Sequence, residues 1–116
     1  MADRKALKAQ YRQMKPDMGV FVIQSKNTGQ FHLESTSDLK SSINSASFKL
    51  NVGNHPNKFL QKAWTAEKES SFRIEVMEKL EYREEDSGQS YSEELSLMRD
   101  ILESQFAEDG FVPYRK

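Results

Sequence analysis

The spacing of apolar residues predicts a helix and a β-hairpin in the first third of the chain. Residues 3–14 carry apolar side chains every three or four positions among basic ones, which indicates an amphipathic helix that Pro16 should end. Residues 19–24 and 31–33 are rich in β-branched and aromatic side chains, and the segment between them contains Asn and Gly. We therefore expect two strands joined by a turn.

Two helices should follow the hairpin. The pair Ser37 and Asp38 is typical of a helix start, and Gly53 is a typical stop. The apolar face expected for this first helix comprises Leu39, Ile43, Ala46, Phe48, Leu50 and Val52. The second helix should open at residues 55–57, with a proline in its first turn. Its expected buried stripe comprises Phe59, Leu60, Ala63 and Trp64.

The remaining residues predict one strand, an acidic loop and a last helix. Residues 71–80 alternate apolar and polar side chains, as in a strand with one buried face, and residues 81–88 indicate an exposed acidic loop. Ser90 or Ser92 should cap the last helix, which Gly110 ends. Its expected apolar face comprises Tyr91, Leu95, Met98, Ile101, Leu102 and Phe106. This order favours an α/β fold with a small, three-stranded, mainly antiparallel sheet flanked by helices.

The length and composition limit the chemistry. A chain of 116 residues suffices for one modest core, and we divide it into a basic N-terminal helix (1–15) and a domain (16–116). The chain has no cysteine, which excludes disulfides, thiolate metal sites and cysteine nucleophiles. No stretch approaches the roughly 20 apolar residues of a membrane span. We therefore expect a cytoplasmic protein without membrane contact.

The net charge of −1 hides an asymmetry between the two halves of the chain. Residues 1–66 carry ten Lys/Arg against four Asp/Glu, and residues 67–116 carry seven against fourteen. A polyanion such as DNA would have to meet the first half. The candidate contacts are Arg4, Lys5, Lys8, Arg12, Lys49, Lys58 and Lys62. The alternative is that the two halves attract each other, or that these faces are only solvated.

Several short motifs occur at a specific spacing. The triplet Gly19-Val20-Phe21 is followed, after ten residues, by His32-Leu33-Glu34. Met14-Lys15-Pro16 precedes the first triplet, Ser35 and Asp38-Leu39 follow the second, and residues 53–64 read GNHPNKFLQKAW. Together these segments resemble the GIY-YIG nucleases, in particular a bacterial branch of small, stand-alone proteins. The resemblance runs from about residue 3 to residue 106 and implies a GIY-YIG-like fold.

The same resemblance implies which residues should carry out catalysis. In GIY-YIG nucleases the motif tyrosines, an arginine on the following helix and a glutamate on a later helix activate water, offset the developing charge and hold the metal. The corresponding positions in this chain hold Phe21, His32, Ser45 and Arg99, whereas His55 is retained. Phenylalanine has no hydroxyl and serine no positive charge. The resemblance therefore implies a degenerate active site.

His32 and Glu34 offer an alternative chemistry. Residues two apart on a strand project from the same face, so these side chains should meet, but a metal site needs a third ligand from another element. Glu103, on the last helix, is a second candidate ligand. His55 is interpreted either as a helix-start histidine bonded to a loop or as a phosphate contact.

Three hypotheses follow. The leading one is a catalytically inactive GIY-YIG-like domain, without a cofactor, that binds nucleic acid or another partner. The second is a divergent DNA endonuclease that uses His32 as base, Glu34 or Glu103 as ligand, and Mg²⁺ or Mn²⁺. The third is an adaptor that binds protein through the acidic residues 81–94 and does not contact DNA.

Overall fold

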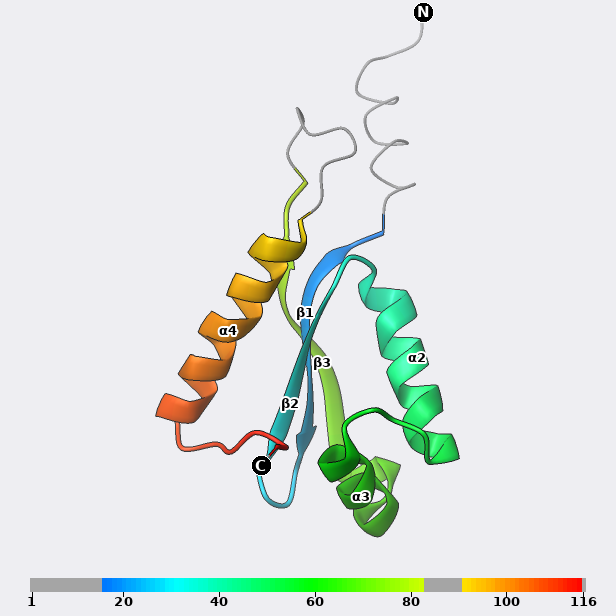
Figure 1. The fold of residues 1–116 in the computed structure, drawn as a ribbon. Helices are drawn as coiled ribbons and strands as arrows, with labels where there is room; N and C mark the ends of the chain where they lie inside the picture. The colour runs from blue at the N-terminus through cyan, green and yellow to red at the C-terminus, as the bar shows by residue number, and fades with distance from the viewer. Residues whose placement is uncertain (1–15, 83–90, 116) are drawn as a thin grey trace, which may run out of the picture.

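The protein forms three layers, with a sheet between two layers of helices (Figure 1). The computed structural model describes residues 16–82 and 91–115. The sheet is antiparallel, has the order β2-β1-β3, and consists of β1 (Met18–Ser25), β2 (Phe31–Thr36) and β3 (Phe72–Leu80). The helices are α2 (Leu39–Val52), α3 (Lys58–Glu67) and α4 (Ser92–Glu108), with a short 3-10 turn (Glu69–Ser71) before β3. The predicted helix at 3–14 and the loop at 83–88 lie outside the described residues.

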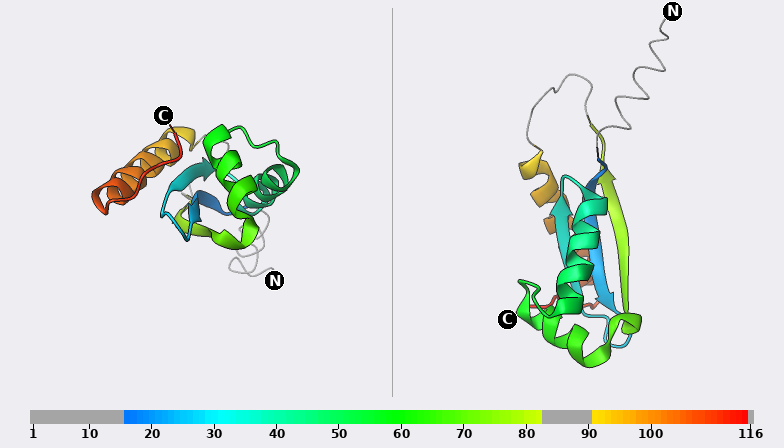
Figure 2. Two further views of the ribbon diagram at one scale, coloured as in Figure 1. Left: turned by 90° about the horizontal axis from the view of Figure 1, so that it is seen from below. Right: turned by 90° about the vertical axis from the view of Figure 1, so that its right-hand side faces the viewer.

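The predicted fold class is confirmed, and β1 explains how the layers are held. Every residue of this central strand is buried, because it pairs with β2 on one side and β3 on the other. Its side chains alternate between the two layers: Phe21 and Ile23 pack against α2 and α3, and Val20 and Val22 pack against α4. Figure 2 shows the helices on opposite faces of the sheet.

Gly19 is required where β1 passes closest to β3. A Cβ atom at this position would lie 2.0 Å from the backbone oxygen of Glu78. The β1–β3 register shifts between Val20 and Phe21, which is a bulge directly beside this contact. The glycine of the first motif triplet therefore has a packing role.

The predicted helix boundaries around α2 and α3 are largely confirmed. Asp38 caps α2 by accepting a hydrogen bond from the Ser41 N–H (3.1 Å), and Gly53 ends it in the left-handed conformation with φ 81°. Asn57 caps α3 by accepting from the Leu60 N–H (3.1 Å). Pro56 lies before this cap, so the prediction that it belongs to the first helical turn was wrong.

The prediction of buried faces was wrong at four residues. Phe48, Val52, Phe59 and Ile101 are 67%, 58%, 51% and 50% exposed. In α2, for example, each residue turns about 100° around the axis, so a side chain two positions from a buried one points to the other side. Because each helix contacts the sheet along one narrow stripe, neighbours of buried residues remain exposed.

The start of α4 also differs from the prediction. Ser92 is already the first helical residue, and the cap position is Tyr91, whose side chain makes no capping hydrogen bond. Tyr91 is buried ahead of the helix, against Met18 and Leu95. The prediction that Ser92 caps the helix was therefore wrong, and Ser90 lies outside the described residues.

The outer edge of β2 is covered by residues from the C-terminal part of the chain. The Phe31 N–H donates to the Val112 carbonyl (3.1 Å), and the Tyr114 N–H donates to the Phe31 carbonyl (2.8 Å). The Arg99 Nε donates to the Leu33 carbonyl (3.0 Å). These contacts satisfy edge groups that would otherwise be open to pairing with another chain. Among the helices of 16–82 and 91–115, none combines the length and apolarity that crossing a membrane would require.

Candidate functional site

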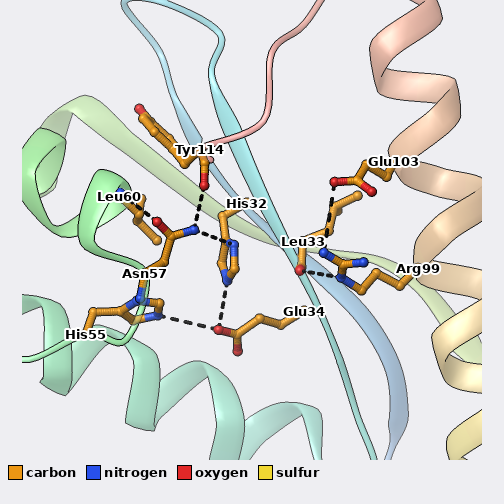
Figure 3. A network of polar contacts seen from close by, with 9 residues as sticks. All are labelled: His32, Leu33, Glu34, His55, Asn57, Leu60, Arg99, Glu103 and Tyr114. Atoms are coloured by element: carbon orange, nitrogen blue, oxygen red, sulfur yellow. Dashed lines mark hydrogen bonds and ion pairs between the residues drawn. The ribbon is translucent and has the colours of Figure 1, made fainter. Parts of the chain in front are cut away.

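Two histidines and a glutamate meet between β2 and the α2–α3 connection (Figure 3). The Nε2 atom of His32 lies 2.9 Å from Oε1 of Glu34, and the Nε2 atom of His55 lies 3.4 Å from the same oxygen. The two imidazole rings stand edge to face, with centroids 5.5 Å apart. This cluster brings together three of the residues that the sequence singled out.

The local structure explains how these side chains converge. In β2, Phe31 and Leu33 face α4, so His32 and Glu34 project from the opposite face. Gly53 ends α2, and the connection of residues 53–57 brings His55 into a buried position with 6% exposure. The His55 N–H donates to Oε1 of Gln61 (3.0 Å), which fixes the connection against α3.

Asn57 fixes the orientation of both histidines. Its Oδ1 accepts from the Leu60 N–H, and its Nδ2 donates to the Tyr114 carbonyl (2.8 Å), so the amide can point only one way. The second Nδ2 hydrogen then points to Nδ1 of His32 (3.2 Å). The backbone N–H of Asn57 donates to Nδ1 of His55 (3.0 Å).

These contacts determine where the imidazole protons lie. Both Nδ1 atoms face an N–H donor and must therefore accept, so in the neutral ring the proton is on Nε2. The His32 Nε2–H donates to the Glu34 carboxylate, and Nε2 of His55 lies at ion-pair distance from the same oxygen. The cluster is thus a carboxylate held by two N–H donors, with no imidazole lone pair left free.

The two histidines also keep Glu34 charged. Burial raises the pKa of the Glu34 carboxyl, but the hydrogen bonds from His32 and His55 outweigh this effect and lower the pKa from 4.5 to about 2. The Glu34 side chain is 32% exposed, so one side of the carboxylate still meets solvent. Glu34 is therefore an anion over the whole physiological pH range.

A pocket of about 250 Å³ opens beside the cluster. One helix face of α2 supplies most of its wall, with hydroxyls and one ammonium group, and Glu34 and His55 close it. Its lining residues are Glu34, Ser41, Ser42, Ser45, Ala46, Lys49, His55 and Pro56. The predicted positions Ser45 and Lys49 therefore share this pocket with Glu34 and His55.

The other expected catalytic positions have structural surroundings. Phe21 is fully buried in the core and lies opposite Glu34 in the β1–β2 register. Arg99 is on the α4 side of the sheet, where it binds the edge of β2. Glu103 lies there too, with Oε1 3.1 Å from Arg115 and 3.9 Å from Arg99. Among the described residues, Glu103 is not part of the His32–Glu34–His55 group.

The donor chemistry of this group does not suit a divalent cation. Mg²⁺ takes oxygen ligands in octahedral geometry, whereas two of the three groups here are nitrogens. Zn²⁺ accepts histidine and glutamate, but a neutral histidine that binds through Nε2 carries its proton on Nδ1. Both Nδ1 atoms face N–H donors of Asn57. A metal would have to break these hydrogen bonds.

Sequence reasoning missed the role of Asn57 and of the C-terminal segment. Residues 55–57 were expected only to open the second helix, yet Asn57 orients two histidines and binds the Tyr114 carbonyl. No local pattern reports a contact between residues 57 and 114. The hydroxyl face of α2 did leave a signal, because Ser42, Ser45 and Lys49 recur at spacings of three and four.

Comparisons with known proteins bear on the fold. No protein-family model and no curated protein sequence matches this chain. Two solved structures resemble it. A mutant of the catalytic domain of intron endonuclease I-TevI has a TM-score of 0.64 at 13% identity, over 78% of this chain and 84% of that one. A structure of the catalytic domain of homing endonuclease I-TevI has a TM-score of 0.65 at 12% identity, over 85% and 99%. I-TevI is a GIY-YIG homing endonuclease, and the chain accordingly has a GIY-YIG-like fold.

Proposed function

We propose that this protein is a GIY-YIG-like domain that binds nucleic acid without cleaving it and contacts the phosphate backbone through α2 and α3. The observation that carries the proposal is the charge of this layer. α2 and α3 contain four lysines, Lys40, Lys49, Lys58 and Lys62, all exposed, and one acidic residue, Glu67 at the end of α3. In contrast, α4 carries five acidic residues against one arginine. A polyanion is attracted to one face of the sheet and repelled by the other.

Other features of the same layer support binding. Ser41, Ser42 and Ser45 offer hydroxyl groups beside Lys49, and hydroxyl and ammonium groups are common phosphate contacts. Phe48 and Phe59 expose aromatic rings on α2 and α3, next in sequence to Lys49 and Lys58. Exposed rings among lysines suit stacking on nucleic-acid bases.

The absence of cleavage is inferred from the chemistry of the pocket. Phe21 is a core residue without a hydroxyl, and Ser45 provides no cation against a pentavalent phosphorus. Both imidazoles are engaged as donors to Glu34, so neither offers a lone pair to a water molecule. These residues support a binding module better than an enzyme.

Fluorescence anisotropy with labelled duplex and single-stranded DNA tests the binding proposal. The variant carries Lys49→Met, Lys58→Met and Lys62→Met, and the control removes the same charge away from α2 and α3 through Lys26→Met, Lys79→Met and Arg115→Met. The first variant should bind at least about tenfold more weakly at low salt and lower the log–log salt slope for duplex by about 2.5. Equal losses in both variants would contradict binding through α2 and α3.

A divergent nuclease is the second candidate, because His32, Glu34 and His55 do converge. Supercoiled plasmid incubated with the protein and Mg²⁺ or Mn²⁺ should stay intact. Metal-dependent nicking that disappears in His32→Ala would replace the binding proposal with an enzyme. If neither duplex nor single-stranded DNA is retained at low salt, a protein-binding adaptor is favoured instead.

A further inference from the structure

The convergence of two N–H donors on one carboxylate has the geometry of a bound oxyanion. We propose that His32, His55, Ser45 and Lys49 form an oxyanion site for a phosphate group, and that Glu34 is its built-in occupant. In the wild-type protein Glu34 would thus keep external anions away from the Nε2 atoms of His32 and His55, while Ser45 and Lys49 remain accessible from the pocket. This inference does not depend on nucleic acid being the partner, since it concerns the phosphate group alone.

The donors of the proposed site are the Nε2 atoms of His32 and His55. Asn57 occupies both Nδ1 atoms with its own N–H groups, so the two Nε2 atoms can only donate. Their common target is Oε1 of Glu34, at 2.9 and 3.4 Å. A donor pair of this kind calls for an anionic acceptor, and phosphate oxygens accept such bonds as carboxylate oxygens do.

The pocket wall around Glu34 carries a positive charge. Among the described residues that line the pocket, Glu34 is the only acid and Lys49 the only lysine, and three serine hydroxyls complete the wall. If the glutamate is removed, only donors and a positive charge remain. The resulting field favours an anion and repels a cation.

The pocket is large enough for a phosphate group and is open to solvent. The pocket of about 250 Å³ has room for several water molecules, at about 30 Å³ each, and thus for a phosphate group. The Glu34 side chain is one-third exposed and flexible. It is the only group that must be displaced before an external anion can reach the two histidines. Because the pKa of the Glu34 carboxyl is about 2, protonation does not release this side chain from the histidines near neutral pH. Substituting Glu34 removes the carboxylate directly.

The test is a titration of inorganic phosphate against chloride at constant ionic strength, followed by thermal unfolding and by the ¹⁵N signals of the imidazoles. Glu34→Ala should bind phosphate with a Kd in the millimolar range, at least tenfold more tightly than wild type, and so raise the Tm by several degrees at tens of millimolar. The double variant Glu34→Ala with Lys49→Met should lose most of this response. Glu34→Gln should respond little to phosphate, because the glutamine side chain still occupies the position beside the two histidines.

Three results would overturn the inference. The first is a folded Glu34→Ala protein that responds to phosphate no more than wild type. The second is wild type binding as tightly as the variant. The third is Zn²⁺ raising the Tm of wild type but not of Glu34→Ala, which would make the cluster a metal site. If Glu34→Ala does not fold, Glu34→Ser repeats the experiment with a side chain that strands tolerate better.

Dimethyl phosphate separates the two sources of the ligand. If it binds Glu34→Ala as inorganic phosphate does, the site takes phosphodiesters, and the variant should also bind DNA more tightly than wild type. If only inorganic phosphate binds, the oxyanion site stands without a role in nucleic-acid binding. A protein that does not bind DNA can therefore be distinguished from one whose Glu34→Ala variant does not bind phosphate.

Discussion

Glu34 links the protonation of the candidate site to the stability of the fold. Its carboxyl pKa is lowered from 4.5 to about 2 by His32 and His55 against the effect of burial, so the ionised form favours the folded state. A group with a lowered pKa contributes stability that is present above its unfolded-state pKa and is lost as the pH falls through the folded-state pKa. Here that window lies between about pH 4.5 and pH 2.

The variant Glu34→Gln should therefore be less stable than wild type at pH 7, by roughly 1–2 kcal/mol once solvent screening of a one-third exposed group is allowed for. The gap should shrink as the pH falls from 4.5 towards 2. Urea unfolding at a series of pH values measures it. Glu108→Gln is the control, because Glu108 is exposed at the end of α4. A Glu34→Gln gap that persists unchanged at pH 2 would contradict the assigned contacts.

Lys68 is a second residue whose conformation has a measurable effect. It adopts φ 75° and ψ 159°, a region that only glycine enters freely, while its N–H donates to the Trp64 carbonyl at the end of α3. Lys68→Gly should stabilise the protein by about 1 kcal/mol. The backbone strain that glycine relieves in the folded state exceeds the free-energy cost of the extra chain entropy of the unfolded state. Lys62→Gly, inside α3, should destabilise it by about 1 kcal/mol. Thermal unfolding of both should give shifts of opposite sign.

At the level of elements, the pairing of β1 with β3 depends on Gly19. An added Cβ would lie 2.0 Å from the Glu78 oxygen, so the strands would have to separate. Gly19→Ala should destabilise the protein by about 3 kcal/mol, in the upper range for overpacking. Gly53→Ala meets no atom within 4 Å and suffers only from φ 81°, so about 1 kcal/mol is expected. Similar losses in the two variants, measured by urea unfolding, would show that the clash at Gly19 is relieved.

The order and type of the elements could be predicted because local chemistry encodes them. Asp38 and Gly53 bound α2 through a side-chain cap and a left-handed φ, both of which follow from residue type. Whether Phe48 and Phe59 are buried or exposed could not be predicted in the same way. Which stripe of a helix contacts a three-stranded sheet is set by long-range packing, and an apolar residue beside that stripe looks the same in the sequence.

The candidate site could be predicted only in part, for the same reason. The alternation of side chains in β2 was sufficient to expect His32 and Glu34 on one face. His55 joins them because a connection between two helices folds back, and its orientation depends on an amide held by the Tyr114 carbonyl. Contacts between residues 32, 57 and 114 are a property of the tertiary fold.

At the scale of the whole molecule, the sheet separates two layers of opposite charge. α2 and α3 hold four lysines and one acidic residue, and α4 holds mainly acids, on opposite sides of the sheet in Figures 1 and 2. A charged partner thus meets a directional field, which orients it before contact. The acidic residues of α4 contribute to this field from the opposite side of the sheet.

Removing part of the acidic layer should therefore strengthen binding in a salt-dependent way. We consider Glu93→Gln, Asp100→Asn and Glu108→Gln together, three acidic positions on α4 whose side chains are exposed. At 0.01 M salt the screening length is about 30 Å, so these charges reach across the domain and their removal should increase DNA affinity several-fold. At 0.15 M the screening length falls to about 8 Å, and the two proteins should bind equally. Anisotropy titrations at both salt concentrations measure this, and an increase that persists at 0.15 M would mean that DNA contacts α4 directly.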